Sequence, residues 1–475
     1  MFIMLLLGIS IILIISCFTS KIMFKLGVPT LLIFILIGMF LGYDGPGNIY
    51  FDDANLAKNI SSFALIFIMF YGGFGLDWKK AKTSVKPASL LATLGVAITA
   101  FAIGFFVHWF FKVSLVEGML LGAVVSSTDA ASVFSILNTQ KLNLKNNLGY
   151  LLEMESGSND PMSYMLTLIF ISLTLGQEVN VISMIVIQIT LGVVLGLLIG
   201  KIGVKIINKI NLEIDGLYSI LLIAIAIFSY AFTEYLSGNG FLAVYFTGII
   251  LGNSKIVHRF SMIKYFDGLT WLMQIILFFT LGLLVFPSQL PNVALDGIII
   301  SVFIIFVARP IAVFSILSFF KYSFKEKLLI SWAGFRGAAS IVFATFALSY
   351  NVAMANWIFN IIFIVALLSV IFQGSLFIPI AKKLNLVEDE ELSLTTFYDE
   401  SGTISADLLE IEIDEESSAL NQLIMNLEIP DDILIVMINR KGKVITPKGN
   451  VRLLLNDKII LAGKKTTLEE LTTGF

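Results

Sequence analysis

Residues 155–161 read ESGSNDP and place several polar side chains inside a stretch otherwise apolar enough to cross a lipid bilayer. Residues four apart are neighbours on an α-helix, so Glu155 lies beside Asn159, and Ser156 lies beside Asp160 on the adjacent face. A carboxylate near the bilayer centre costs about 2.5–3.5 kcal/mol on insertion scales, which makes Asp160 a candidate ion or proton site facing a water-filled cavity. The alternative is a polar cluster that only packs helices, or an ion pair that only stabilises the fold.

Two further segments share a composition rich in small residues. Residues 123–134 read AVVSSTDAASVF and residues 331–346 read SWAGFRGAASIVFATF, with one charge each, Asp129 and Arg336. They lie an odd number of predicted segments apart and therefore have opposite orientations, as in inverted-repeat transporters whose interrupted helices meet near the midplane. Gly334 and Gly337 flank the arginine and would allow a helix break. The alternative is ordinary small-residue helix packing.

These residue types suit a hard monovalent cation, which prefers carboxylate, hydroxyl and carbonyl oxygens. Asp160 and Ser156 can converge on such an ion, and Asp129 would be a second carboxylate. A buried Glu155 needs a positive partner to stay charged, and Arg309 and Arg336 are the arginines deep in the apolar part of the chain.

The composition indicates an all-α polytopic membrane protein. The 475 residues are 57% hydrophobic and only 14% charged, with a mean hydropathy of +0.92, outside the range of soluble globular proteins. About thirteen apolar segments are long enough for transmembrane helices. They fall near residues 2–20, 28–42, 59–76, 88–111, 115–137, 147–175, 180–200, 216–235, 240–253, 268–286, 294–320, 327–349 and 355–380.

The distribution of basic residues predicts the orientation. Lys and Arg concentrate in every second loop, from Lys21 and Lys25 to the final pair Lys382 and Lys383, whereas the intervening loops contain only Lys58 and Lys112. By the positive-inside rule the N-terminus lies outside and the C-terminal tail in the cytoplasm of a bacterial cell membrane. Residues 2–20 lack a basic leader and a small-residue cleavage site, so we expect a helix there rather than a signal peptide.

The chain changes character after residue 386. We expect a transmembrane domain at residues 1–386, a polar linker at 387–402, and a small α+β domain at 403–475. The tail is strongly acidic, which disfavours nucleic acid as a partner. The single cysteine, Cys17, excludes an intramolecular disulfide, and two histidines without soft-ligand clusters argue against a transition-metal site.

The motifs SSTDAASVFSIL, LEMESGSNDPMSYML, VARPI and GFRGAAS resemble the monovalent cation:proton antiporters of the NhaP group, particularly its potassium/proton branch, over residues 1–386. The resemblance implies a homodimer in the lipid bilayer, with a core that moves against a dimer domain. It assigns the cation and proton carrier to Asp160, with Asn159 as its structural neighbour. It also implies that Thr128, Asp129 and Ser156 contribute to the site. Glu155 and Arg309 would form a stabilising ion pair.

One departure from the family pattern concerns cation choice. Sodium-exchanging relatives usually have proline after the Thr-Asp pair, whereas this chain has Ala130, as in the potassium branch. The cation is therefore expected to be K⁺, with Na⁺ as the alternative.

The tail contains DLLEIEID at residues 407–414 and SSALNQLIMNLEIPDDILIVMINRKGKVITPKGNVRLLLNDKIILAG at residues 417–463. These segments resemble the TrkA-C or RCK-C regulatory domain of potassium channels and transporters. In some relatives this module binds a nucleotide such as cyclic di-AMP at a dimer interface; the alternative is a domain that only aids assembly. No G-x-G-x-x-G fingerprint occurs in the tail, so we expect no NAD site and no other cofactor.

Together these features predict a secondary active antiporter, not an enzyme, that exchanges one monovalent cation for one proton by alternating access. A ligand-gated cation channel would combine similar parts, but a TVGYG-type selectivity filter is absent from the sequence. A non-transporting sensor would leave the intramembrane charges at Asp129, Asp160, Arg309 and Arg336 unexplained.

Overall fold

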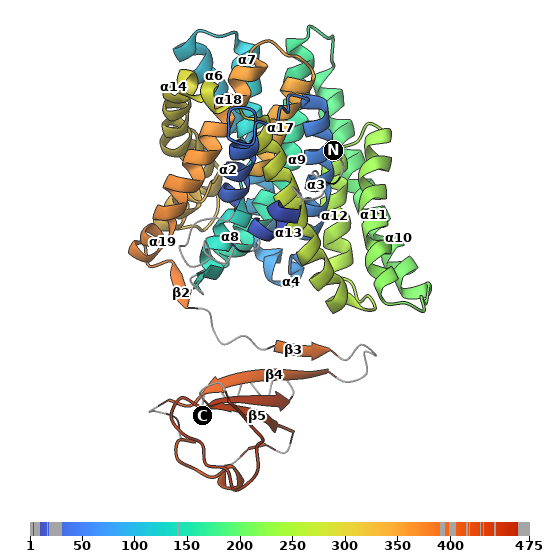
Figure 1. Ribbon diagram of the computed structural model, residues 1–475, viewed down its shortest axis with the longest axis vertical. Helices are drawn as coiled ribbons and strands as arrows, with labels where there is room; N and C mark the ends of the chain where they lie inside the picture. The colour runs from blue at the N-terminus through green and yellow to red at the C-terminus, as the bar shows by residue number, and fades with distance from the viewer. Residues whose placement is uncertain are drawn as a thin grey trace. The chain divides into compact units, whose positions relative to one another are not determined.

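The structure is a computed structural model of the chain (Figure 1). It describes residues 3, 10–16, 18, 31–139, 142–389, 395–398, 405–414, 417, 419–427, 429–430, 432–440 and 443–463. The chain divides into two compact units, Met1–Glu388 and Asp389–Phe475. Most of the first predicted segment, together with Lys21, Lys25 and Cys17, lies outside the described residues, although residues 10–16 are helical.

The first unit is helical, and its contacts separate it into two bundles. The first bundle contains α2 (Leu31–Leu41), α3 (Ala54–Gly75), α10 (Val181–Lys209), α11 (Gly216–Tyr235), α12 (Gly240–Gly252) and α13 (Arg259–Leu284). Helix α3 packs closely on α12 because both have glycines in the contact: a β-carbon on Gly248 would overlap the Phe70 carbonyl. Short connections carry caps, such as Asn239, whose side chain accepts a hydrogen bond from Leu242 N–H at the start of α12.

The second bundle contains the remaining helices, and two of its membrane-crossing segments are interrupted. Its members are α4 (Trp78–Ala81), η1 (Lys82–Ser84), α5 (Val85–Leu90), η2 (Leu91–Gly95), α6 (Val96–Phe111), α7 (Leu115–Val125), α8 (Ala130–Thr139), α9 (Leu148–Thr174), η3 (Pro287–Gln289), α14 (Leu290–Phe303), η4 (Ile304–Ala308), α15 (Arg309–Leu317), α16 (Phe324–Trp332), α17 (Ala338–Ser349), α18 (Ala355–Leu368), η5 (Ser369–Gln373) and α19 (Gly374–Lys383). The segments η2, η4 and η5 are π-helical turns inside longer helices, a feature frequent near functional sites. Strand β1 (Leu142–Leu144) pairs with β2 (Val387–Asp389).

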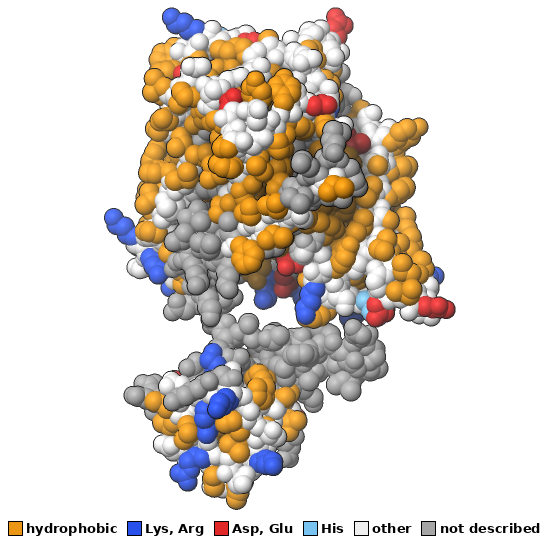
Figure 2. Space-filling view, viewed as in Figure 1, with side chains coloured by type: hydrophobic (Ala, Val, Ile, Leu, Met, Phe, Trp, Pro, Cys, Tyr) orange, Lys and Arg blue, Asp and Glu red, His pale blue; other side chains and the backbone are white. Residues whose placement is uncertain are grey.

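The surface of this unit is suited to a bilayer. Seven helical stretches among the described residues are long and apolar enough to span a membrane, and shorter apolar helices lie between them. In Figure 2 hydrophobic side chains cover the flanks of the helical unit, while its charged side chains gather at the two ends. The helical polytopic fold is confirmed, whereas the number of thirteen segments stays a prediction.

The described residues of the second unit form one antiparallel sheet in the order β3-β4-β7-β5-β6. The elements are β3 (Thr395–Tyr398), β4 (Ser405–Glu412), the 3₁₀ turn η6 (Ile424–Asn426), β5 (Leu434–Arg440), β6 (Lys443–Ile445) and β7 (Lys458–Gly463). Alternate residues face the core: Leu409 pairs with Leu461 and Ile411 with Ile459, and all four side chains are buried. The domain boundaries at 387 and 403 stay predictions.

Candidate functional site

Two helices of the second bundle are broken at corresponding places. Helix α7 ends at Val125 and α8 begins at Ala130, so residues 126–129 are not helical. Helix α16 ends at Trp332 and α17 begins at Ala338, which leaves residues 333–337 unwound. The two unwound segments cross, since Asp129 N–H donates to the Phe335 carbonyl at 2.9 Å.

Charged side chains at the crossing complement the ends of these half-helices. The Arg336 guanidinium donates to the Ser126 and Ser127 carbonyls, at 2.8 and 2.6 Å, just past the C-terminus of α7. The Asp129 carboxylate accepts from Ser132 N–H at 3.2 Å and from its hydroxyl at 2.7 Å, at the N-terminus of α8. A cation at a helix C-terminus and an anion at an N-terminus are both favourable.

Helix α9 supplies the remaining partners for the first break. The Ser156 hydroxyl accepts from Ala130 N–H at 3.1 Å and donates to the Thr128 carbonyl at 2.9 Å. The Asn159 amide donates to the Thr128 hydroxyl at 2.5 Å. The Ser156 hydroxyl therefore satisfies two backbone groups that the broken helix leaves free, as unwound segments at membrane depth require, and Asn159 holds the Thr128 side chain.

Glu155 and Arg309 form a bidentate ion pair between α9 and α15. The two hydrogen bonds measure 2.6 and 2.9 Å, and the residues are 1% and 3% exposed. Gly334 makes room for this pair, because a β-carbon there would lie 2.6 Å from Arg309 Nε and 3.0 Å from its Cδ. The glycine therefore has a packing role in addition to the helix break that the sequence predicts.

Asp160 lies on α9 beside the crossing and is 9% exposed. Its Oδ1 atom is buried and has no hydrogen-bond partner within the described part of the chain. Asp160 lines a cavity of about 50 Å³ between the two bundles. The lining combines polar residues Ser127, Thr128, Asp129, Asp160 and Gln274 with Leu65, Ile68, Ala131, Phe278, Gly337, Ala338 and Ala339. A small space whose lining includes carboxylate and hydroxyl oxygens, one of them the unpartnered Oδ1 of Asp160, fits a monovalent cation or a proton.

Gly337 is the last residue of the second break and lines this cavity. A β-carbon on it would overlap the Asp129 carboxylate, so the glycine allows the two unwound segments to approach each other. Arg336 thus holds the crossing by hydrogen bonds, and Gly337 permits it by having no side chain.

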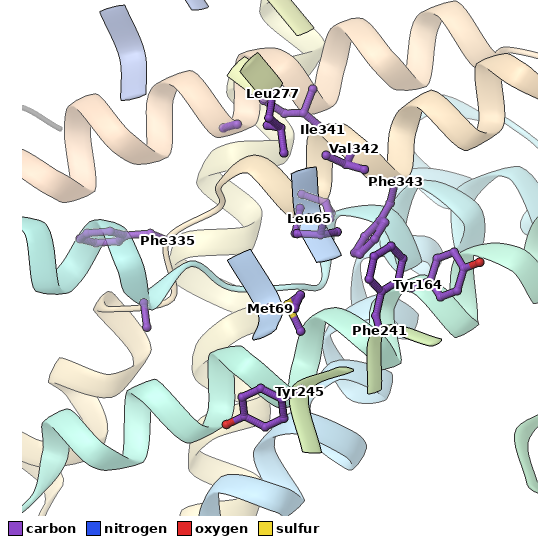
Figure 3. Packing of buried hydrophobic residues seen from close by; sticks show 14 of the residues in the cluster. Leu65, Met69, Tyr164, Phe241, Tyr245, Leu277, Phe335, Ile341, Val342 and Phe343 are labelled. Carbon is purple, nitrogen blue, oxygen red and sulfur yellow. The ribbon is translucent and has the colours of Figure 1, made fainter. Parts of the chain in front are cut away.

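Aromatic side chains close the seam between the bundles one turn beyond Asp160 along α9. Tyr164 of α9 contacts Phe241 of α12 and Phe343 of α17, with ring centroids 5.0 and 5.8 Å apart (Figure 3). Asn239 of the first bundle donates to the Pro161 carbonyl at 2.7 Å. Packed rings and a buried hydrogen bond thus join the two bundles at this level of α9.

The structure brings the sequence-predicted residues together around one crossing, with Glu155 and Arg309 in a neighbouring pair. It also shows supporting residues that sequence reasoning missed. Ser369 accepts from Arg336 N–H at 2.9 Å, and Gln373 donates to the Trp332 carbonyl at 3.0 Å, the last carbonyl of α16. The sequence signal that could have identified Ser369 and Gln373 is a polar residue within an apolar segment, the same signal that identified Asp160.

A helical membrane protein in which two interrupted helices cross beside an unpaired carboxylate, at the seam of two bundles, belongs to the class of secondary transporters. A family profile described as "Sodium/hydrogen exchanger, transmembrane" matches residues 9–383, and one described as "TrkA-C domain" matches residues 408–473. The chain belongs to the sodium/hydrogen exchanger family and is a cation/proton antiporter, not an enzyme. Both predicted resemblances are confirmed.

Individual relatives agree with this assignment. The chain is 36% identical to the K(+)/H(+) antiporter NhaP2 of Shewanella baltica, over 97% of this chain and 81% of that protein. It is 27% identical to the Na(+)/H(+) antiporter ApNhaP of Aphanothece halophytica, over 68% and 64% of the two chains. The solved structure of the sodium proton antiporter MjNhaP1 from Methanocaldococcus jannaschii superimposes with a TM-score of 0.71 at 25% identity, covering 81% of this chain and 99% of that one.

Proposed function

We propose that the protein exchanges cytoplasmic K⁺ for external H⁺ one for one, with Asp160 as the shared carrier of cation and proton. The buried Oδ1 of Asp160, which has no hydrogen-bond partner among the described residues, supports this assignment most directly, because Asp160 and Asp129 both line one small cavity. Asp129, Thr128 and Ser156 would contribute oxygens to the cation, and Asn159 would hold Thr128 in place.

Competition for one carboxylate is sufficient to couple the two fluxes. Asp160 must release its proton to bind a cation and release the cation to bind a proton. Both loaded forms are neutral, whereas the empty form is charged and would be costly to carry through the apolar seam. One carboxylate next to Asn159, in place of a second aspartate, supports an electroneutral exchange.

The two bundles provide the parts for alternating access. Asp160 and the crossing belong to one bundle, and α3, α12 and α13 of the other form the facing wall. A rocking movement of the core along this seam would open the cavity to one side and then to the other. The packed rings of Tyr164, Phe241 and Phe343 would seal one side in the conformation described here.

Potassium is favoured over sodium by the activities for which the relatives are named and by one residue of this chain. The relative from Shewanella baltica at 36% identity is named a K(+)/H(+) antiporter, whereas the Na(+)/H(+) antiporter from Aphanothece halophytica matches at 27%. Ala130, rather than proline, follows the Thr-Asp pair.

The assembly and its regulation complete the proposal. The protein would be a homodimer in the bacterial cell membrane, with its N-terminus outside and its tail in the cytoplasm. The TrkA-C domain would regulate exchange, with cyclic di-AMP as the candidate ligand. The match of a TrkA-C profile to residues 408–473 supports a regulatory tail.

The carrier assignment is tested by cation-dependent dissipation of a pH gradient in proteoliposomes. Wild-type protein should respond to K⁺ more strongly than to Na⁺. Asp160→Asn retains the size of the side chain and its hydrogen-bonding atoms but removes the titrating group, so exchange should fall below one tenth of wild type with little loss of folded protein. If Asp160→Asn retains exchange, another residue must carry the cation and the proton.

The role of the tail is tested by truncation. Removing residues 389–475 leaves the whole helical unit, so exchange should persist. Cyclic di-AMP should then change the activity of the full-length protein and leave the truncated protein unaffected, because a ligand shifts activity only through different affinity for two states. A truncated protein without exchange at any pH would contradict this division of roles, and a full-length protein insensitive to the nucleotide would exclude this ligand.

A further inference from the structure

Glu153 is a carboxylate of α9 that the mechanism above does not use. It lies seven residues before Asp160, so it is on nearly the same face of the helix and about 10 Å away along the axis. Within the described chain it makes no hydrogen bond or ion pair. Glu155, two residues later, is neutralised by Arg309. The side chain of Glu153 therefore lacks the structural role that accounts for its neighbour.

The helix face between Glu153 and Asp160 is partly exposed. Ser156 and Gly157 are partly exposed, as is Glu153, while Met154 and Glu155 are buried. Ser156 and Gly157 are three and four positions after Glu153, so they form one stripe with it along α9, and this stripe ends at Asp160, which lines the cavity.

A second polar group points at the middle of this stripe. Tyr245 of α12 is 1% exposed, and its hydroxyl has no hydrogen-bond partner within the described residues. Its ring contacts Gly157 so closely that a β-carbon there would lie 2.8 Å from the hydroxyl oxygen. Figure 3 shows this ring beside α9, on the first-bundle side. The hydroxyl thus reaches α9 between the two carboxylates, at four residues from Glu153 and three from Asp160.

The electrostatic surroundings of Glu153 favour cations. The charged group that acts on it is another carboxylate, Asp77, at the N-terminus of α4. Neither Glu153 nor Asp77 forms an ion pair among the described residues, and two such carboxylates raise the local concentration of cations.

We propose that Glu153 and the Tyr245 hydroxyl form a second cation station, which receives a dehydrating monovalent cation between bulk water and Asp160. In the proposed orientation this station lies on the cytoplasmic side. The inference rests on the proposed antiport function and adds an entry site to it. A unit charge about 10 Å from the carrier, across partly hydrated protein, changes cation occupancy roughly three- to tenfold.

The test measures exchange in proteoliposomes as a function of K⁺ concentration. Glu153→Gln should raise KM for K⁺ about three- to tenfold and change the maximal rate less than twofold. Glu153→Asp, which retains the charge, should stay near wild type. Glu213→Gln is the matched control, because Glu213 is an exposed carboxylate in the loop before α11. It should leave KM unchanged.

Two further measurements separate an electrostatic role from a structural one. Choline chloride should raise KM of the wild type by screening the carboxylate, and should have less effect on Glu153→Gln. Tyr245→Phe keeps the carboxylate and the ring, and should raise KM by a smaller factor. If Glu153→Gln does not fold, the KM of Tyr245→Phe and the salt response of the wild type still test the proposed station.

The outcomes distinguish this inference from the function on which it rests. Wild-type exchange with an unchanged KM in both Glu153→Gln and Tyr245→Phe would refute the station and leave the antiporter intact. Absence of cation-dependent exchange in the wild type would refute the proposed function itself.

Discussion

The buried pair of Glu155 and Arg309 allows a prediction that goes beyond the loss of one contact. Both side chains are almost fully buried, and the pair is bidentate at 2.6 and 2.9 Å. Breaking such a pair by removing one partner typically costs about 3–5 kcal/mol, because the other charge remains buried and uncompensated. Glu155→Gln and Arg309→Gln should each fall within this range.

The surroundings make the two losses unequal. Arg336 is near enough to interact electrostatically with both members of the pair. Without Glu155, two arginines remain close together with no anion between them. Without Arg309, Glu155 still has the attraction of Arg336. Glu155→Gln should therefore be the more destabilising variant.

The double variant Glu155→Gln/Arg309→Gln removes both charges and should lose clearly less than the sum of the singles, with a coupling of about 2–3 kcal/mol. Unfolding of a membrane protein in detergent is commonly irreversible, so the assay is the apparent Tm at a fixed scan rate, followed by size-exclusion fluorescence. Glu178→Gln changes an exposed carboxylate after α9 and should leave Tm unchanged. Additive losses would show that the pair does not exist, and a larger loss in Arg309→Gln would remove Arg336 from the explanation.

Two further predictions concern the crossing and the tail. Gly337→Ala should displace the Asp129 carboxylate and reduce exchange at subsaturating K⁺ at least severalfold. The control is Gly72→Ala, which should keep wild-type exchange because a β-carbon there meets nothing within 4 Å. Equal exchange in the two variants would exclude this steric role of Gly337. In the tail, burial alone raises the pKa of Asp457, but hydrogen bonds from Arg440 and Leu454 N–H outweigh burial and hold the pKa below its ordinary 3.8. A lowered folded-state pKa stabilises the fold above pH 3.8, and this stabilisation is lost as the pH falls through the folded-state value. Asp457→Asn should therefore destabilise the tail by roughly 1.5–3 kcal/mol at pH 7, and the difference in stability from wild type should shrink below pH 3.8. The rate of proteolysis of the tail in the full-length protein measures this stability. A difference that does not change with pH would contradict the argument.

Much of the fold was predictable because bilayer insertion imposes strong rules on local sequence. Apolar stretches identify helices wherever they are long, and a polar residue within one marks a site because its cost in lipid is high. For this reason Asp160, Asp129, Glu155 and Arg309 could be selected before any contact was known. The break at Gly334 and Gly337 was also predictable, since both glycines lie in an otherwise regular apolar segment.

The contacts across the crossing were not predictable from local sequence, because they join residues far apart in the chain. Nothing local pairs Arg336 with the Ser126 and Ser127 carbonyls, 210 and 209 residues away. The bonds of the Ser156 hydroxyl to Ala130 N–H and to the Thr128 carbonyl likewise join residues 26 and 28 positions apart, while its role as a cation ligand stays a prediction.

The sequence by itself determined that the chain is a helical membrane transporter with a buried carboxylate and an acidic, strand-forming tail. Those properties follow from composition, periodicity and charge, which act residue by residue. Only the tertiary structure decided which charges neutralise each other and which remain free. Glu153 and Glu155 are two residues apart and chemically identical, yet only Glu155 faces Arg309. The direction of each side chain on α9, and the helix that packs against it, make one carboxylate structural and leave the other available to a cation.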